Sequence, residues 1–485
     1  MKFQASGVNE IDRSKPGSEE RPRQGDLTQG PVLRTLIGFS VPMLIGNVIQ
    51  TLNGSINAIW VGRLIGESAL AATANANVVM FLLFAAVFGL GNATTVRVGQ
   101  LFGASDIDAA RRTFGGGVGF CLMFSAVVAV IGALTCEGLL HLLATPSGSL
   151  EEAEIYLRVV FVTMPFGTLS MILGMGLRGT GDSKTPLHAM ILTVALDVVL
   201  NPLLIRGFGP VPACGIGGSA AATALANVAG VLLILRRLYA RDLPMRLRGR
   251  EIGYLLPRKD DLAYIVGKGL PMGMQMLLIT SSQVVVVGLV NREGLNATAA
   301  YSASMQLWSY LQMPAFAIGT AVSAMVAQNI GARRHDRIGE ITRVGMLTNL
   351  AMTGVLALLI VLAARPLLAV FLGAASPAMP IAHHLQLVVT WSYVAMGVMM
   401  VLSGTMRAYG VVMAPLVIQI VSLYPIRLGF YFLFYPEFGD DALWWSFPAS
   451  TIASAAMTWL LYVKGSWRRR DQAASSTPGD PVAAK

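Results

Sequence analysis

Residues 100–104 read Gln-Leu-Phe-Gly-Ala and residues 328–332 read Gln-Asn-Ile-Gly-Ala, so Gln, Gly and Ala recur 228 positions later. Further pairs keep an offset of 228 or 229 on both sides of this stretch. They are Pro42 with Pro271, Ala71-Ala72 with Ala299-Ala300, Arg178 with Arg407, Gly181 with Gly410, and Pro186-Leu187 with Pro415-Leu416. One register held at several separate places indicates an internal duplication. The chain is therefore predicted to contain two copies of one structural unit.

The composition predicts an integral membrane protein. Hydrophobic residues make up 54% of the 485 residues and charged residues only 13%, whereas a soluble domain carries about 25% charged residues. A membrane helix needs ~20 apolar residues, and the period-2 alternation of a membrane barrel is absent. We therefore expect an all-α protein with twelve transmembrane helices, near residues 34–58, 68–96, 113–144, 153–177, 185–207, 217–239, 262–291, 296–325, 342–373, 379–405, 411–435 and 442–464.

The duplication places six of these helices in each half. The predicted parts are a polar tail (1–32), an N-terminal six-helix lobe (33–240), a basic linker (241–261), a C-terminal six-helix lobe (262–464) and a disordered tail (465–485). Because six is even, both copies enter the membrane in the same orientation, and the pseudo-twofold axis lies along the membrane normal. In a membrane protein such a repeat is typical of a transporter with its site between the halves.

The positive charges predict the orientation. Of the 36 Lys and Arg residues, 30 fall on the side of the two termini and the even-numbered loops. Cytoplasmic loops carry such an excess, so both termini are expected in the cytoplasm and the protein in the cytoplasmic (inner) membrane. The net charge of +10 follows from this topology, and nucleic-acid binding is not expected because the charges lie at the ends of the helices.

No enzyme motif is found. Gly179–Lys184 superficially resembles a phosphate-binding loop, but Ser183 stands where the motif has Gly, and no strand precedes it. The three cysteines have no metal-ligand spacing, and the five histidines form no i, i+4 pair. We therefore expect no enzyme activity, no metal and no cofactor, and an ion gradient of H⁺ or Na⁺ as the source of energy.

Asp197 is the one carboxylate deep in a predicted membrane helix. It lies 13 residues after Lys184 and nine before Arg206, which puts it about 14–20 Å from either end. A charge at that depth costs several kcal/mol unless it is protonated, paired or hydrated. Asp197 is therefore expected to face a polar cavity as the coupling acid, although it could instead tie two helices together. The repeat position in the other half holds Ile426.

Polar residues at helical spacing accompany Asp197. Asn201 follows it by one turn, and the first and sixth helices carry further polar residues on one face each. We assign Asp197, Asn201, Asn57 and Thr223 to the ion-coupling site, and Gln50, Asn53 and Asn227 to a substrate cavity. The same amides could also serve as hydrogen bonds between helices.

Four motifs together resemble the MATE (multidrug and toxic compound extrusion) family, within the wider group that includes lipid-linked oligosaccharide flippases. They are Val61-Gly62 with Ala71-Ala72, Leu177-Arg-Gly-Thr-Gly-Asp-Ser-Lys-Thr-Pro186, Gly269-Leu-Pro271 and Ala327-Gln-Asn-Ile-Gly-Ala332. The resemblance runs from about Leu33 to Val463. It implies a V-shaped pair of six-helix lobes around a central cavity, alternating access, antiport of organic cations against H⁺ or Na⁺, and a hinge at Pro42.

The chain departs from the family pattern at the site. Many members carry a carboxylate in the first helix where this chain has Asn57, and one branch has Asn before Asp where this chain has Asp197 before Asn201. The acids that another branch carries in the second half are replaced by Ile279 and the region of Gly410. Coupling is therefore expected in the first lobe, and a single acid favours H⁺ over Na⁺, which prefers several oxygen ligands.

In the second half we expect a soft cavity wall on the seventh and eighth helices. Methionine-rich surfaces accommodate varied ligands, and an indole can stack on a cation. The residues assigned to this wall are Gln275, Met276, Ser281, Ser282, Gln306 and Trp308, although such methionines are also ordinary packing residues.

The expected function is a secondary active exporter of small, cationic, amphipathic compounds that acts as a monomer in the lipid bilayer. The alternatives are a lipid-linked oligosaccharide flippase and a non-transporting receptor or scaffold. A flippase would need several cationic residues in its cavity to hold phosphate, and Arg427 is the one deep basic residue found.

Overall fold

The computed structural model describes residues 25–142, 150–207 and 212–465. Regular structure in these residues is helical throughout. The N-terminal lobe contains α1 (Val32–Leu64), α2 (Glu67–Gly103), α3 (Ile107–Leu134), α4 (Cys136–Leu142), α5 (Leu150–Gly179), α6 (Lys184–Arg206) and α7 (Gly215–Ala240). A short 3₁₀ helix, η2 (Gly249–Leu255), lies in the linker.

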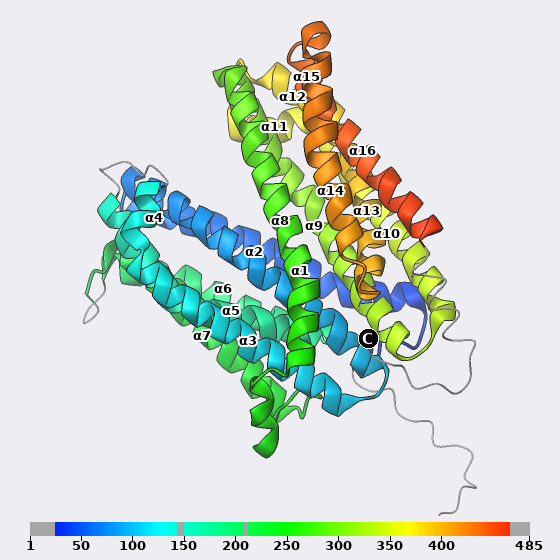
Figure 1. Cartoon of the computed structure of the whole chain (residues 1–485). Helices are drawn as coiled ribbons and strands as arrows, with labels where there is room; N and C mark the ends of the chain where they lie inside the picture. The colour runs from blue at the N-terminus through cyan, green and yellow to red at the C-terminus, as the bar shows by residue number, and fades with distance from the viewer. Residues whose placement is uncertain (1–24, 143–149, 208–211, 466–485) are drawn as a thin grey trace, which may run out of the picture.

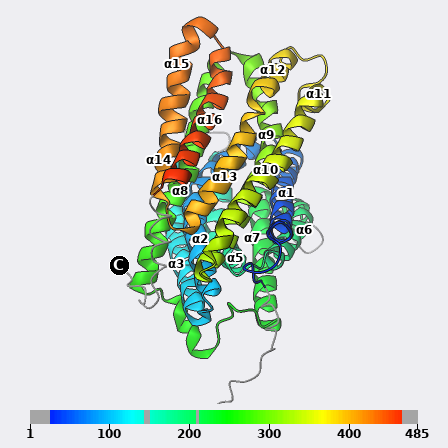
Figure 2. The ribbon, with the colours of Figure 1, turned by 90° about the vertical axis from the view of Figure 1, so that its right-hand side faces the viewer.

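The C-terminal lobe contains α8 (Lys259–Arg292), α9 (Leu295–Gly331), α10 (His335–Leu362), α11 (Ala364–Leu372), α12 (Met379–Val389), α13 (Ser392–Ala408), α14 (Met413–Val421), the π-helical turn η3 (Ser422–Ile426), α15 (Arg427–Phe438) and α16 (Asp441–Lys464). The two lobes form a V that opens toward the ends carrying α4 and α11–α12 (Figure 1). Within the C-terminal lobe α16, α13 and α10 run side by side (Figure 2).

The helices have the length and composition of membrane spans. Within the described residues ten helices are long and apolar enough to cross a membrane, and the pair α12–α13, bent by 41°, makes an eleventh. Helix α16, with 24 residues, is not among these and completes twelve when α14, η3 and α15 are counted as one. This architecture confirms the predicted fold class.

Two predicted spans are shorter than expected. The spans predicted at 113–144 and 342–373 end as helices at Leu134 and Leu362, and the short helices α4 and α11 follow. Pro366, in the first turn of α11, cannot donate to the carbonyl of Leu362 and clashes with it, so the long helix stops there. Gly138, 228 residues earlier, occupies the matching place in α4.

The lobes meet chiefly through the four helices α1, α2, α8 and α9. Helix α2 packs on α8, α1 packs on α9, and α2 also packs on α9. The α2–α8 crossing uses glycine, because a Cβ on Gly89 would lie 2.3 Å from the carbonyl oxygen of Gly269. Small residues at such crossings let two backbones approach closely.

Reciprocal hydrogen bonds hold the closed end of the V. Gln100 Nε2 of α2 donates to the carbonyl oxygen of Ala408 (2.8 Å), at the end of α13. Its repeat partner, Gln328 Nε2 of α9, donates to the carbonyl oxygen of Gly179 (2.9 Å), at the end of α5. Part of the predicted tail also packs here, since the Leu27 N–H donates to Gln328 Oε1 (2.9 Å).

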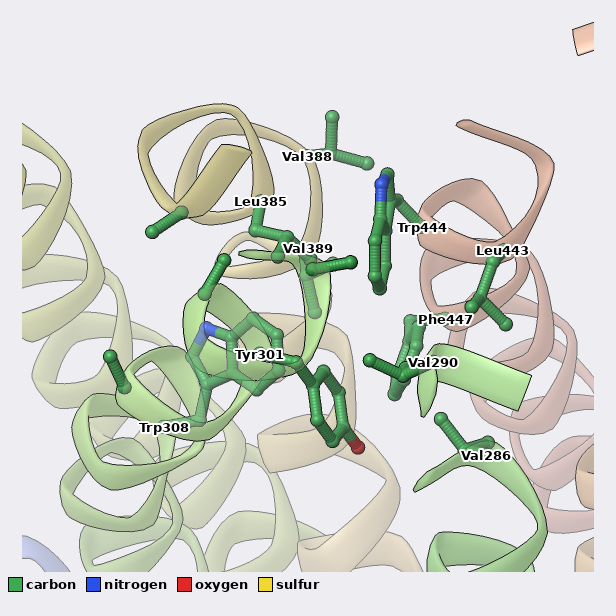
Figure 3. Packing of buried hydrophobic residues seen from close by; sticks show 14 of the residues in the cluster. Val286, Val290, Tyr301, Trp308, Leu385, Val388, Val389, Leu443, Trp444 and Phe447 are labelled. Carbon is green, nitrogen blue, oxygen red and sulfur yellow. The ribbon is translucent and has the colours of Figure 1, made fainter. Parts of the chain in front are cut away.

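Aromatic residues fill the core of the C-terminal lobe. Trp308 and Tyr301 of α9 meet edge to face at 5.9 Å between ring centroids, and Trp444 and Phe447 of α16 pack beside them (Figure 3). Burying such rings contributes much of the packing energy of a core. This cluster sets the back wall of a cavity described below.

Candidate functional site

Asp197 lies at the junction of α1, α6 and α7, and its side chain is 0% exposed. Its Oδ2 accepts hydrogen bonds from Asn53 Nδ2 (2.8 Å) and Asn57 Nδ2 (2.7 Å), one turn apart on α1. Its Oδ1 accepts from Thr223 Oγ1 of α7 (2.9 Å) and from Asn201 Nδ2 (3.2 Å). Within the described residues no Lys, Arg or His forms an ion pair with this carboxylate.

All four donors to Asp197 are neutral. A buried carboxylate without a basic partner is held by its hydrogen bonds alone, so its charge remains available to a proton or a cation. Asn201 Nδ2 also donates to Asn57 Oδ1 (3.2 Å), which links α6 to α1 a second time. The buried Asn53 Oδ1 and Asn201 Oδ1 have no hydrogen-bond partner among the residues that the structure describes. These two oxygens could accept from a protonated carboxyl or help to bind a cation.

A cavity of about 310 Å³ in the N-terminal lobe lies directly in front of this cluster. Its wall includes Gln50, Asn53 and Asn57 from α1 and Thr223 and Asn227 from α7. Asp197 itself does not line the cavity; it lies behind the residues that bond to it. A solute in the cavity would therefore act on the carboxylate through Asn53, Asn57 and Thr223, or after these side chains move.

Of the six residues assigned to the site in the second half, three line cavities and three do not. Gln275 and Met276 line a cavity of about 280 Å³ between the lobes, and Gln275 Nε2 donates to the carbonyl oxygen of Val412 (3.3 Å). Trp308 lines a neighbouring cavity of about 300 Å³ inside the C-terminal lobe. Its side chain is 2% exposed, and its Nε1 donates to Gln386 Oε1 (3.2 Å), so little of the indole is open to a ligand.

Three assigned residues lie outside the walls of these cavities. Gln306 is exposed, because the cavity face of α9 carries Met305, Trp308, Ser309 and Gln312 at helical spacing. Ser281 is exposed and shares a hydrogen bond with the Tyr424 hydroxyl (2.6 Å). Ser282 is buried and accepts from Arg427 Nη1 (3.4 Å).

Two arginines that the sequence analysis did not assign to the site line the cavity walls. Arg427 lines the cavity inside the C-terminal lobe and Arg407 lines the cavity between the lobes. The depth of Arg427 in its span was visible in the sequence. Arg407 follows the span predicted at 379–405, a place typical of an anchor at the membrane surface, and nothing in the sequence marks it as a cavity residue.

Pro42 lies within α1, which continues as one helix from Val32 to Leu64. Pro42 removes the backbone hydrogen bond to the carbonyl of Gly38, so α1 has a weak point in its N-terminal third. The structure shows the helix in a single conformation, and the hinge therefore stays a prediction.

Comparison with known proteins agrees with this architecture. The MatE family model matches residues 42–203 and 271–433; these segments begin 229 residues apart and end 230 apart. The chain is 34% identical over 433 residues to "Probable multidrug resistance protein YoeA" of Bacillus subtilis (strain 168), covering 89% of this chain and 93% of the relative. It is 26% identical to a "FAD transporter" of Shewanella oneidensis, covering 83% and 88%.

Among solved structures, a multidrug resistance MATE family transporter in an outward-facing conformation superposes with a TM-score of 0.84. Its sequence is 21% identical, and the match covers 95% of this chain and 100% of that one. This likeness shows the fold. Since the family model matches both halves of the duplication, the chain is a multi-pass membrane transporter of the MATE family, and not an enzyme.

Proposed function

We propose that this protein is a secondary active exporter of amphipathic small molecules, of the multidrug type, and that it exchanges them for protons through Asp197. The observation that carries the proposal is the buried carboxylate of Asp197. It accepts hydrogen bonds from four neutral donors and lies beside a cavity of about 310 Å³. The names of relatives support it, because several are called multidrug resistance or export proteins.

The cycle follows from the single negative charge. A proton taken up from outside neutralises Asp197 while the V is open to that side. After the lobes tilt, a cationic solute from the cytoplasm favours the ionised carboxylate, and the proton leaves inward. The solute is released when the cavity opens outward again. On the Lys and Arg distribution we place both termini in the cytoplasm. We further propose that the protein acts as a monomer in the inner membrane.

Proton coupling is proposed over Na⁺ because one carboxylate balances one proton, whereas Na⁺ prefers several oxygen ligands. The oxygens without partners, Asn53 Oδ1 and Asn201 Oδ1, are the observation that favours Na⁺. The flippase alternative needs cationic cavity walls, and Arg407 and Arg427 are the observation that favours it.

The test is efflux of a fluorescent cation, rhodamine 123, from proteoliposomes under separately imposed proton and Na⁺ gradients. Asp197→Asn should abolish the proton-driven efflux, since the amide cannot be charged. Asp336→Asn, an exposed position at the start of α10, is the matched control and should transport normally. Unchanged pH-dependent efflux by Asp197→Asn would refute the assignment, and efflux driven by the Na⁺ gradient alone would replace the proton. A flippase would instead equilibrate a fluorescent lipid-linked sugar across the same membranes.

A further inference from the structure

We infer that the cavity of the C-terminal lobe is a binding site for an anionic group on the transported solute, with Arg427 as its principal contact. This inference deepens the proposed function and rests on it, because it names a substrate class: amphipathic molecules that carry a carboxylate, sulfonate or phosphate in addition to their cationic group.

Arg427 occupies the place in the C-terminal lobe that Asp197 occupies in the N-terminal lobe. The repeat offset of 229 carries Asp197 onto Ile426. However, α14 and α15 are joined by the π-helical turn Ser422–Ile426, and such a turn inserts one residue relative to an α-helix. The offset is therefore 230 beyond the turn, as it is at the ends of the two matched segments, and Asp197 then falls on Arg427.

The contacts of Arg427 follow the same symmetry. Asp197 bonds to Asn53 of α1, and Arg427 bonds to Ser282 of α8, which lies 229 residues after Asn53. Asp197 also bonds to α7 through Thr223, and Arg427 Nε donates to Ser450 Oγ of α16 (3.0 Å), the last helix of its own lobe. The two lobes thus hold opposite charges at equivalent sites.

Arg427 is 9% exposed. A guanidinium has five N–H donors, and the hydrogen bonds to Ser450 and Ser282 use two of the five. The Phe447 ring lies 4.7 Å from the guanidinium carbon and holds the group in the cavity wall. Within the described residues no carboxylate forms an ion pair with it. A buried cation with free donors is well suited to bind an anion from the cavity.

The walls around Arg427 carry positive charge only. The cavity inside the C-terminal lobe and the cavity between the lobes share five lining residues, Ile279, Gln283, Gln312, Met400 and Gln419. Arg427 lines the first and Arg407 the second, and none of the described lining residues of either is Asp, Glu, Lys or His. The remaining walls are methionine, aliphatic, aromatic, amide and hydroxyl side chains, and their apolar part fits an apolar body attached to the anionic group.

Two dyes that share one ring system make the test specific. Rhodamine 123 is a cationic methyl ester, and rhodamine 110 is the same molecule with a free carboxyl group. Binding of each dye to the purified full-length protein in phosphatidylcholine nanodiscs is measured by fluorescence anisotropy. Arg427→Gln should weaken rhodamine 110 binding about tenfold to a hundredfold, the range of a charge-assisted hydrogen bond, and leave rhodamine 123 within about threefold, well under the tenfold that 1.4 kcal/mol represents. Arg427→Lys should keep part of the affinity for rhodamine 110.

Rhodamine 123 binding by Arg427→Gln also reports that the variant is folded. Equal losses for both dyes, or no loss for either, would overturn the inference. A loss for rhodamine 110 that occurs only in phosphatidylglycerol nanodiscs would assign Arg427 to a lipid headgroup and overturn it as well. Asp197→Asn separates this inference from the proposed function: it should abolish proton-driven rhodamine 123 efflux while rhodamine 110 binding persists.

Discussion

The hydroxyl of Thr223 is the only described donor that α7 gives to Asp197. Thr223→Val keeps the shape of the side chain and removes the O–H, so Oδ1 retains only the longer bond from Asn201 (3.2 Å). Losing a hydrogen bond to a charged group costs about 1.5–3 kcal/mol, and we expect proton-driven efflux of rhodamine 123 to fall about tenfold or more. The measurement is initial efflux rate in proteoliposomes at a fixed proton gradient.

Thr163→Val is the matched control for this prediction. Thr163 lines the same cavity but donates to the carbonyl of Val159 on its own helix (2.9 Å). Thr163→Val should change efflux little, because it removes no hydrogen bond to Asp197. Equal rates for the two valine variants would mean that Thr223 only supports packing.

Much of this cluster could be predicted residue by residue. Depth within a span singled out Asp197, and helical spacing grouped Asn53 with Asn57 and Asp197 with Asn201. The equivalence of Asp197 and Arg427 was missed, because the sequence alone gives no sign that a π-helical turn shifts the register by one residue. Gln306 and Ser281 were predicted to line a cavity but are exposed. Which side of a long apolar helix faces a cavity depends on the helices packed around it.

At the scale of the helix, α1 is the membrane helix in which bending at a proline, Pro42, can be tested. Pro42 deprives the carbonyl of Gly38 of its usual partner. Pro42→Ala would restore that hydrogen bond and stiffen the helix. If α1 bends at Pro42 in each cycle, transport should slow several-fold while rhodamine 123 binding stays unchanged. Anisotropy and efflux measured on one preparation separate the two effects.

Pro436→Ala controls for replacing proline as such. Pro436 also lies inside a helix, α15, but near its end and exposed. Pro436→Ala should leave efflux at the wild-type rate. Faster or unaltered efflux by Pro42→Ala would exclude bending at this position as a necessary step.

The number and order of membrane helices were predictable, because each span carries its own apolar run. Their internal breaks were not. Hydropathy continues across Leu134 and Leu362, and only at Leu362 does a proline, Pro366, mark the end of the helix. The bend of 41° between α12 and α13 likewise leaves no gap in hydrophobicity.

For the whole molecule, the duplication predicted two lobes related by a pseudo-twofold axis, and the structure confirms that arrangement. The sequence could not show how the lobes touch. The recurring Gln and Gly of residues 100–104 and 328–332 served as markers of the repeat. In the structure they are the contact between the lobes, because each glutamine reaches a carbonyl of the opposite half.

The glycines of these two stretches permit the closed end of the V to form. A Cβ on Gly331 would lie 1.8 Å from the carbonyl oxygen of Gln100, and a Cβ on Gly103 would lie 2.0 Å from that of Gln328. Both obstacles are backbone atoms, so no side-chain rotation can relieve them. Gly331→Ala should therefore separate α2 from α9 and shift the protein toward the state that is open at this end.

The separation can be measured by electron–electron double resonance between spin labels at Ala104 and Glu340, both exposed, after replacement of the three cysteines. Gly331→Ala should lengthen this distance and reduce proton-driven efflux, because the state that is closed at this end loses its contact between α2 and α9. Gly354→Ala in α10, where a Cβ meets open space, should leave both quantities unchanged. If Gly331→Ala keeps the wild-type distance distribution, the reciprocal contact does not hold the lobes closed, and the gate must lie elsewhere along α1 and α8.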